Sequence, residues 1–239
     1  MKKIVFTALT DIGKKYQINE DSYVLPKQED KEKLFVLCDG VGGSRAGEVA
    51  SKLTCQWIYE NRIVKGNSLT ESIQMVNKKL FELAQKHPEY SGMCTTLVCG
   101  LFILNTLKIY SFGDSRAYLF RKNSLKQITE DDSTVWKLYK NGLISKDSLR
   151  FHPNNNVITQ ALGSTKNLKK KNSYKIRIKV KDIFLFCSDG LTDMVPDGMI
   201  KQILQKKIPL EQKAKELIKK ANDAGGKDNI TVIIVEVGF

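Results

Sequence analysis

Four short apolar runs in this 239-residue chain each adjoin an aspartate in a turn-like setting. Three end at the aspartate and the fourth follows it: 34–38 before Asp39, 109–112 before Asp114, 183–187 before Asp189, and 230–237 after Asp228. Apolar runs of this length, bounded by glycine, serine and asparagine, are typical of buried strands. We therefore expect the four carboxylates to lie at strand ends and to converge on one acidic site.

The apolar and polar positions predict strands and helices in alternating blocks. Strands are expected at residues 4–10, 22–25, 34–38, 94–104, 108–112, 117–121, 174–180, 183–187 and 230–237. Helices are expected at about 46–61, from a cap at Ser68 to residue 87, at 132–141 with 146–150, and at 210–221. Short turns favour antiparallel pairing, and the blocks favour α+β layers over a doubly wound parallel sheet. With no linker or repeat between the elements, one domain spanning residues 1–239 is predicted.

Charge changes this picture, because 39 basic and 26 acidic residues give a net charge of +13. In the densest basic part, Lys175, Arg177 and Lys179 alternate with apolar residues along a predicted strand. A basic outer face is a common protection for a sheet edge, and a polyanion-binding stripe is the alternative. Aromatic residues do not interleave with the basic ones as a stacking platform requires, so nucleic acid is not expected as a partner.

The sequence predicts a cytoplasmic protein. No apolar stretch approaches the roughly 20 residues of a membrane-spanning helix, and the N-terminal run meets Asp11 before any cleavage signal. The five cysteines are odd in number and lack a CxxC spacing, and three of them (Cys38, Cys99 and Cys187) lie in apolar runs. Such cysteines are expected to be buried and reduced.

Acidic residues in turns and at strand ends form the candidate functional site: Glu20, Asp21, Asp39, Asp114, Asp189, Asp193 and Asp228. One Asp-Gly after a strand is usually only a turn, but several together need a counter-charge, since unit charges 4 Å apart repel by about 4 kcal/mol at an effective dielectric of 20. The ligands are all oxygen and only two histidines exist, which favours Mg²⁺ or Mn²⁺ over zinc or iron. Two such ions can activate a water for hydrolysis of a phosphate ester.

The glycine pair Gly42-Gly43 lacks the GKS/T ending of a nucleotide P-loop. It is better suited to let the carbonyl of Gly40 reach a metal ion.

Seven motifs in order resemble the metal-dependent serine/threonine protein phosphatases of type 2C, in their bacterial branch. They are DIGKKYQINED (11–21), CDGVGGSRAGEVAS (38–51), GMCTTLV (92–98), FGDSRAYLF (112–120), HPNNNVITQALGS (152–164), CSDGLTDMV (187–195) and GGKDNITVIIV (225–235). The resemblance implies a four-layer α-β-β-α sandwich, a mostly antiparallel β-sandwich flanked by helix pairs. It also implies two Mn²⁺ or Mg²⁺ ions at one end of the sandwich.

The resemblance also assigns roles to individual residues. Asp39 is expected to bridge both ions, the Gly40 carbonyl and Glu20 to serve the second, and Asp189 and Asp228 to complete the first. The remaining assignments are Asp21 as an outer-shell partner, Asp114 and Asp193 as ligands of a third, weaker ion, Asn229 as the group orienting a water, and residues 141–165 as the subregion of a mobile flap.

The implied mechanism is in-line attack on phosphoserine or phosphothreonine by a hydroxide that bridges the two ions. Three departures from the family pattern affect substrate binding and proton transfer. Tyr16 replaces a phosphate-gripping arginine, so Lys14, Lys15 and Arg45 are the candidate substitutes. Ser44 replaces a histidine after the double glycine. The usual Asp-His-Ser is Asp-Asp-Ser at 131–133, without a histidine proton donor.

Three interpretations remain distinct at this stage. The first is an active monomeric phosphatase acting on proteins phosphorylated by a serine/threonine kinase. The second is a regulatory pseudo-phosphatase that binds phosphoprotein with weak turnover because Tyr16 replaces the arginine. The third, a metal-dependent nuclease, fits the basic charge but not the order of the motifs.

Overall fold

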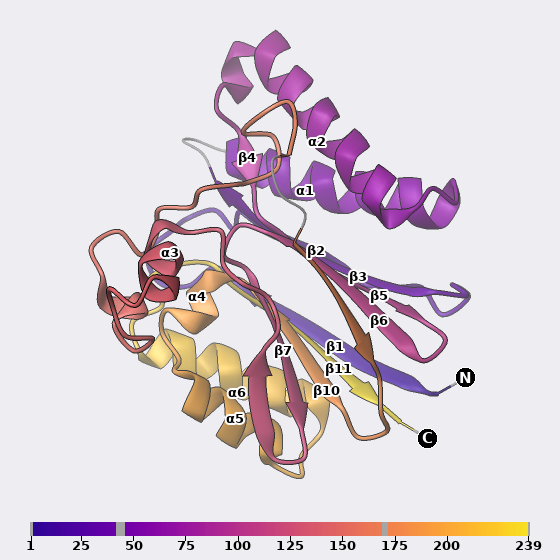
Figure 1. Cartoon of the computed structure of the whole chain (residues 1–239), viewed down its shortest axis with the longest axis vertical. Coiled ribbons are helices and arrows are strands. Elements are labelled where there is room, and N and C mark those ends of the chain that lie inside the picture. The colour runs from indigo at the N-terminus through magenta and orange to yellow at the C-terminus, as the bar shows by residue number, and fades with distance from the viewer. Residues whose placement is uncertain (1, 42–45, 169–171, 239) are drawn as a thin grey trace.

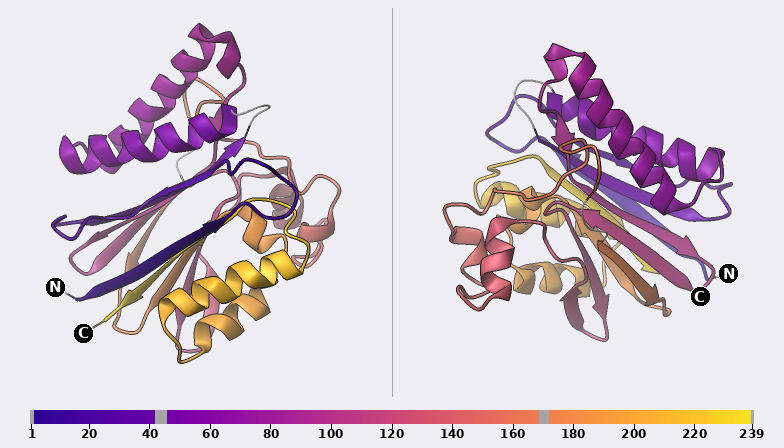
Figure 2. Two further views of the ribbon diagram at one scale, coloured as in Figure 1. Left: turned by 180° about the vertical axis from the view of Figure 1, so that it is seen from behind. Right: turned by 45° about the horizontal axis from the view of Figure 1, so that its top comes forward.

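Two antiparallel sheets stack face to face, and a pair of helices covers the outer face of each (Figures 1 and 2). The structure is a computed structural model that describes residues 2–41, 46–168 and 172–238. The predicted α+β class and the four-layer α-β-β-α sandwich are confirmed.

The first sheet has the strand order β1-β11-β10-β7-β8. Its strands are β1 (Ile4–Asp11), β11 (Ile230–Val237), β10 (Ile183–Cys187), β7 (Arg116–Arg121) and β8 (Ser124–Gln127). The N-terminal and C-terminal strands pair along their whole length, from Ile4 opposite Val237 to Asp11 opposite Ile230. This pairing places the start of β11, directly after Asp228, beside the end of β1.

The second sheet has the order β2-β3-β5-β6-β9, with the short β4 paired to β3. Its strands are β2 (Asp21–Val24), β3 (Lys33–Val41), β4 (Cys94–Thr95), β5 (Leu97–Ile103), β6 (Thr106–Phe112) and β9 (Asn172–Arg177). Because β2 and β3 are antiparallel, Asp21 lies directly opposite Asp39.

Helices α1 (Ala46–Tyr59) and α2 (Leu69–Lys86) cover the second sheet, whereas α5 (Asp197–Gln205) and α6 (Leu210–Asp223) cover the first (Figure 1). A π-helical turn, Glu60–Val64, continues α1. The predicted Ser68 cap is confirmed, because its side chain and that of Glu71 form a reciprocal capping box. Short helices α3 (Thr134–Lys140) and α4 (Asp189–Thr192) and the 3₁₀ turns Pro88–Tyr90 and Leu149–Phe151 complete the chain.

Three layers of apolar side chains hold the sandwich together. One lies between the two sheets and contains Phe35, Phe184 and Phe186. The second joins α1 and α2 to the second sheet, and the third joins α5 and α6 to the first. Side chains alternate across each strand, so both sheets bury residues on both faces and their centres are apolar throughout.

The structure differs from the predicted elements in several places. Strand β3 extends through Asp39 to Val41, and Thr96 divides the expected strand 94–104 into β4 and β5. Helix α5 and strand β8 were not predicted. The expected helix at 146–150 is only the 3₁₀ turn Leu149–Phe151, since its sequence is too short and polar to bury a full helical face.

All five cysteines are free thiols. Cys38, Cys99 and Cys187 are buried as the sequence predicts, Cys55 is buried as well, and Cys94 is partly exposed. Among the described residues, no helix has both the length and the apolar character needed to cross a membrane.

Candidate metal centre

A cleft of about 260 Å³ gathers carboxylates from distant parts of the chain. Its lining residues are Tyr16, Glu20, Asp39, Gly40, Val41, Thr96, Asp114, Asn156, Ile158, Asp189, Asp228 and Asn229. Five of these residues are predicted metal ligands with acidic side chains, and Gly40 is the predicted carbonyl ligand. The convergence expected from the strand-end pattern is therefore present.

Asp39 projects from β3 with its backbone held from both sides. Its N–H donates to the hydroxyl of Thr96 at 3.0 Å. Its carbonyl accepts from the Thr96 N–H and from the Thr95 hydroxyl, both at 2.8 Å. With the backbone thus fixed, the carboxylate remains available to the cleft.

Gly40, which follows Asp39 in β3, packs closely against the start of α1 and binds the backbone of Glu20. A Cβ at Gly40 would overlap the carbonyl of Gly47 at the start of α1, so this close approach of strand and helix requires glycine. The Gly40 N–H donates to the carbonyl of Glu20 at 3.1 Å. The helix, the strand and the 11–21 loop are therefore locked together where the predicted ligands emerge.

Ser188 joins Asp21 to the opposite sheet. Its hydroxyl donates to Oδ2 of Asp21 at 2.8 Å and accepts from the N–H of Thr231 at 3.0 Å. Asp21 itself is 7% exposed and lies opposite Asp39 in the pairing of β2 with β3. Asp189 follows at once as the first residue of α4.

The Asn229 amide fixes the 11–20 loop. Its Oδ1 accepts from the N–H of Glu20 at 2.8 Å, and its Nδ2 donates to the carbonyls of Ile12 and Ile18 at 2.9 and 3.2 Å. The preceding residue, Asp228, accepts from the N–H of Asn229 through Oδ1 at 2.8 Å. The amide thus holds Glu20 toward Asp228.

Burial and mutual repulsion disfavour negative charge on these carboxylates. Burial, the larger cause, raises the pKa of Asp21 and of Asp114 to about 7. The pKa values of Asp39 and Asp189 are raised well above the usual range, first by burial and then by the neighbouring carboxylates. A site that penalises its own charge in this way is suited to bind cations.

Unpartnered buried oxygens test whether the residues fit metal ions. Oδ1 of Asp21 and Oδ1 of Asp189 are buried and have no hydrogen-bond partner among the described residues. Across residues 2–41, 46–168 and 172–238, no three acidic, histidine or cysteine side chains already enclose one point as a finished ion cage would. Repulsion accounts for this spacing, and hard ions also recruit carbonyls and water as ligands. The oxygen donors therefore fit Mg²⁺ or Mn²⁺.

The raised pKa values predict an unusual pH dependence for the metal-free protein. A carboxyl with an ordinary pKa of 3.8 that rises to about 7 on folding binds more protons in the native state between those values. Its contribution to stability is therefore complete below about pH 4 and is lost as the pH rises toward about 7. Thermal denaturation in EDTA is expected to show a midpoint that falls between pH 5 and 7. With saturating Mn²⁺ the trend should disappear, and a rising midpoint in EDTA would contradict this electrostatic account.

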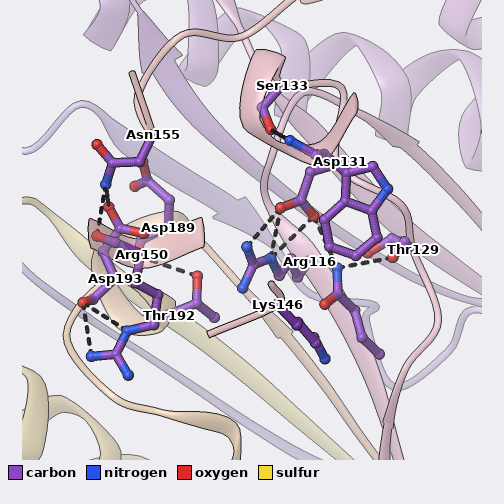
Figure 3. Close-up of polar contacts among 12 residues, drawn as sticks. Arg116, Thr129, Asp131, Ser133, Lys146, Arg150, Asn155, Asp189, Thr192 and Asp193 are labelled. Carbon is purple, nitrogen blue, oxygen red and sulfur yellow. Dashed lines mark hydrogen bonds and ion pairs between the residues drawn. The ribbon is translucent and has the colours of Figure 1, made fainter. Parts of the chain in front are cut away.

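A second polar cluster borders the cleft at Asp193 (Figure 3). The Asp193 Oδ2 accepts from Nδ2 of Asn155 at 2.9 Å, and its carbonyl accepts from Arg150 Nε and Nη2 at 3.3 and 3.2 Å. Burial raises the pKa of Asp193, while Arg116 and Arg150 oppose that rise. The segment 150–155 is thus fastened to Asp193 directly beside Asp189.

Arg116 and Asp131 form a buried ion pair (Figure 3). The guanidinium donates through Nε at 3.0 Å and through Nη2 at 2.6 Å. Gln127 also donates to Asp131. Burial raises the pKa of the neighbouring Asp114, Asp131 raises it further, and Arg116 opposes the rise. The two partners of the ion pair therefore act on Asp114 in opposite directions.

Tyr16 and the residues expected to replace the arginine in phosphate binding differ in how close they lie to the cleft. Tyr16 lines the cleft, and its phenol pKa is raised first by Asp228. Burial raises the pKa of Asp228, and Lys15 lies near enough to oppose that rise. Lys14 is not among the lining residues, and its N–H donates to the carbonyl of Gly226 at 2.8 Å. Arg45, like Gly42, Gly43 and Ser44, lies outside the described residues.

Several site residues escaped the sequence analysis: Thr95, Thr96, Arg116, Asn155 and Ser188. Each acts through a hydrogen bond or ion pair to a carboxylate or to its backbone. A signal for all five was present, because each lies in one of the quoted motifs: Thr95 and Thr96 in GMCTTLV, Arg116 in FGDSRAYLF, Asn155 in HPNNNVITQALGS and Ser188 in CSDGLTDMV. A hydroxyl beside a strand-end aspartate is too common, however, to be singled out without coordinates.

Comparison with known proteins identifies the family. The family model for protein phosphatase 2C matches residues 9–135. The chain belongs to the protein phosphatase 2C family. The serine/threonine phosphatase Stp of Listeria innocua is 36% identical over 236 residues, covering 95% of this chain and 93% of the relative. The protein phosphatase PhpP of Streptococcus pneumoniae is 35% identical over 239 residues, covering 96% of each.

Solved structures agree with this assignment. Stp1 from Staphylococcus aureus superposes with a TM-score of 0.92 at 35% identity, covering 100% of this chain and 96% of that one. The catalytic domain of PstP, in complex with two manganese ions, gives a TM-score of 0.88 at 32% identity and covers all of both chains. This chain is thus a protein-serine/threonine phosphatase, a hydrolase of phosphorylated proteins that uses a divalent metal ion.

Proposed function

We propose that this phosphatase hydrolyses phosphoserine and phosphothreonine at the cleft around Asp39, with two Mn²⁺ or Mg²⁺ ions. The observation that carries the proposal is the gathering of Asp39, Asp189 and Asp228 in one cleft, with a buried unpartnered oxygen on Asp189. The manganese complex of PstP supports the choice of ions for this chain.

Each carboxylate has a separate task in the proposed site. Asp39 would bridge the two ions, Asp189 and Asp228 would complete one ligand set, and Glu20 with the Gly40 carbonyl would serve the other. Ions held by these residues would activate a water as the nucleophile and would neutralise charge on the phosphoryl oxygens. Asp21 would support this arrangement from its position opposite Asp39, through its hydrogen bond from Ser188.

Asn229 contributes by positioning the loop that carries Glu20. Its side-chain oxygen and nitrogen both bind backbone groups of the 11–20 loop, so the amide holds Glu20 and Tyr16 at the cleft. We therefore assign Asn229 a positioning role in the reaction, in addition to any contact with a water in the cleft.

Substrate phosphate would meet Tyr16, which stands at the position of the family's arginine. The phenol can donate one hydrogen bond to a phosphoryl oxygen, and Lys15 adds positive charge nearby. Tyr16→Arg is expected to lower the KM for a phosphothreonine peptide about tenfold, because a charged bidentate contact is stronger than one neutral hydrogen bond. Tyr16→Phe is the control and should change KM by less than about threefold. An unchanged KM in Tyr16→Arg would show that phosphate is held elsewhere.

The same variant distinguishes the active enzyme from the regulatory pseudo-phosphatase. The exposed position of Tyr16, with 55% of its surface accessible, leaves room for an arginine side chain in either case. If the wild type turns over a phosphopeptide and Tyr16→Arg only increases the rate, the active enzyme is supported. If the wild type has negligible turnover and Tyr16→Arg restores it, the pseudo-phosphatase is supported.

A third ion and a flap belong to the same proposal. Asp114 and Asp193 would hold the third, weaker ion, with Asp193 shared with Asn155 of the 141–165 segment. Asn156 and Ile158 of this segment line the cleft, which supports its role as a flap over the substrate.

We further propose that residues 1–239 act as one catalytic domain and as a monomer. We place the protein in the cytoplasm, where free cysteines are stable and where a serine/threonine kinase supplies the substrates.

The test of this function uses the full chain with p-nitrophenyl phosphate and a phosphothreonine peptide. Both should be hydrolysed with Mn²⁺, EDTA should stop the reaction, and added Mn²⁺ should restore it. Absence of any Mn²⁺-dependent hydrolysis of either compound would reject the proposed activity.

A further inference from the structure

The edge of the second sheet exposes a row of basic side chains on its outer face. Strand β6 pairs with β9 so that Lys108 lies opposite Lys175 and Thr106 lies opposite Arg177. The residues between them, including Leu107 and Ile176, pack into the layer between the sheets. Because side chains alternate along a strand, Lys108, Lys175 and Arg177 point outward, and all three are exposed.

A pocket of about 340 Å³ opens on the same face. Tyr110, two residues from Lys108 and thus on its side of β6, is one wall, and its hydroxyl bonds that of Thr70 at 3.0 Å. The remaining lining residues are Ile73, Gln74, Asn77, Lys78, Phe112, Lys166, Asn167 and Leu168. The pocket thus has apolar groups in its floor, amides in its walls, two lysines and no acidic lining residue.

One buried amide holds the loop side of this pocket in place. Nδ2 of Asn77 donates to the carbonyls of Thr165 and Lys166, both at 3.0 Å, and its Oδ1 accepts from the N–H of Gly163 at 2.9 Å. Asn77 is only 1% exposed, so solvent does not compete for these bonds. The pocket is therefore formed before any ligand arrives, which reduces the entropic cost of binding.

The positive charge on this face is not neutralised by neighbouring carboxylates. Among the described residues, Lys108, Lys166, Lys175 and Arg177 form no ion pair, and Lys78 has only a 3.8 Å contact with Glu82. On α6 the arrangement is different, because Lys215 and Lys219 pair with Glu211 and Asp223 at 2.6 and 2.7 Å. An unpaired basic row beside a partly apolar pocket is complementary to an acidic ligand with an apolar anchor.

We propose that this basic face, defined as Lys78, Lys108, Lys166, Lys175 and Arg177 with the Tyr110 pocket, binds an acidic polypeptide segment of protein substrates. An apolar side chain of the segment would enter the pocket while its carboxylates lie along β6 and β9. Phe112 lines the pocket and Asp114 lines the cleft, so the two sites lie at the same end of β6. The identity of the segment as part of a substrate rests on the proposed function, whereas its binding does not.

Two other occupants fit less well. A second copy of this chain would bring the same basic face and a net charge of +13. Single-stranded nucleic acid needs exposed aromatic rings for stacking, but Tyr110 is half-buried and its hydroxyl is occupied. The acidic polypeptide is the occupant that matches both the charge and the apolar floor.

Steady-state kinetics with matched peptides test this inference. All peptides share a phosphothreonine core. The acidic peptides add a segment rich in Asp and Glu with one leucine, either before or after the core, and each has a counterpart with a Ser/Gln segment of equal length. For the wild type, the acidic peptide with the lower KM should have a KM about tenfold below that of its Ser/Gln counterpart. The variant K108E/K175E/R177E should lose this preference, with kcat and p-nitrophenyl phosphate hydrolysis unchanged.

The control variant K126E/K207E/K220E makes the same charge change at exposed positions around the first sheet: Lys126 on β8, Lys207 in the loop between α5 and α6, and Lys220 on α6. It should keep the preference. Equal KM values in the wild type, or equal losses in both variants, would overturn the inference.

A separate binding measurement distinguishes failure of this inference from failure of the proposed function. Fluorescence anisotropy with the acidic segment lacking phosphate should show binding that K108E/K175E/R177E abolishes, even if no substrate is hydrolysed. Replacing the leucine by serine should weaken binding. Displacement of the segment by an equal concentration of single-stranded DNA would instead define a general polyanion site and overturn the proposal.

Discussion

Replacing Asp39 with asparagine is expected to reduce Mn²⁺-dependent hydrolysis of p-nitrophenyl phosphate by about 10³-fold. The carboxylate lies at the centre of the acidic cleft, opposite Asp21 and within electrostatic reach of Asp189 and Asp114. A neutral amide cannot bridge two cations, and the loss of several kcal/mol of charge stabilisation corresponds to this factor in rate. The measurement is steady-state hydrolysis across Mn²⁺ concentrations, so that weak binding and slow turnover are separated.

The same substitution is expected to stabilise the metal-free protein. Burial and neighbouring carboxylates raise the pKa of Asp39, so its ionised form is unfavourable in the folded state. Thermal denaturation in EDTA at pH 7 should therefore show a higher midpoint for Asp39→Asn than for the wild type. The exposed Asp147→Asn makes the same chemical change and should alter neither property. A variant with normal activity, or with reduced stability in EDTA, would be incompatible with the assigned role of Asp39.

Replacing Arg116 with alanine should have the largest effect on folding, a loss of about 3–5 kcal/mol in the free energy of unfolding. The guanidinium side chain is 12% exposed and that of its partner Asp131 is 4% exposed, so the substitution leaves a buried carboxylate without a counter-charge. Tyr118, which links Arg116 to Asp197, would lose a contact as well. Denaturant unfolding measures the change directly.

The exposed pair of Lys140 and Glu130 provides the control, because Lys140→Ala should cost less than about 1 kcal/mol. The double variant Arg116→Met with Asp131→Leu removes both charges and should recover much of the stability. If Arg116→Ala unfolds within about 1 kcal/mol of the wild type, the ion pair is not the stabilising contact that its burial indicates.

The layered fold was predictable because its central strands are short apolar runs with clear ends. Strand 183–187 and strand 230–237 are confirmed at the predicted bounds, and the Ser68 cap correctly marks the start of α2. Helix α5 was missed because its nine residues begin after Pro196, with no hydrophilic cap to mark the start. Strand β8 was missed because its sequence, SLKQ, is mostly polar and lacks an apolar run. It lies at the edge of the sheet, where its pairing with β7 determines the strand structure.

The acidic residues of the cleft were predictable from the sequence, but the residues that hold them in position were not. Asp39, Asp189 and Asp228 follow from apolar runs that adjoin aspartates, and strand pairing brings such ends together. Ser188 and Asn155 act across long sequence separations, so only the folded chain reveals their contacts with Asp21 and Asp193. Sequence alone also placed Asp39 at the end of its strand, whereas β3 continues to Val41 because Gly40 and Val41 pair with Thr95 and Cys94 of β4.

The central claim is that Asp39 joins two cations within one acidic cleft. Anomalous diffraction at the manganese edge, from crystals of the full chain grown with Mn²⁺, tests it most directly. The account predicts two strong peaks in the cleft, both in contact with Asp39, one beside Asp189 and Asp228 and the other beside Glu20 and the Gly40 carbonyl. Manganese bound only outside the cleft, or a cleft ion that does not touch Asp39, would contradict it.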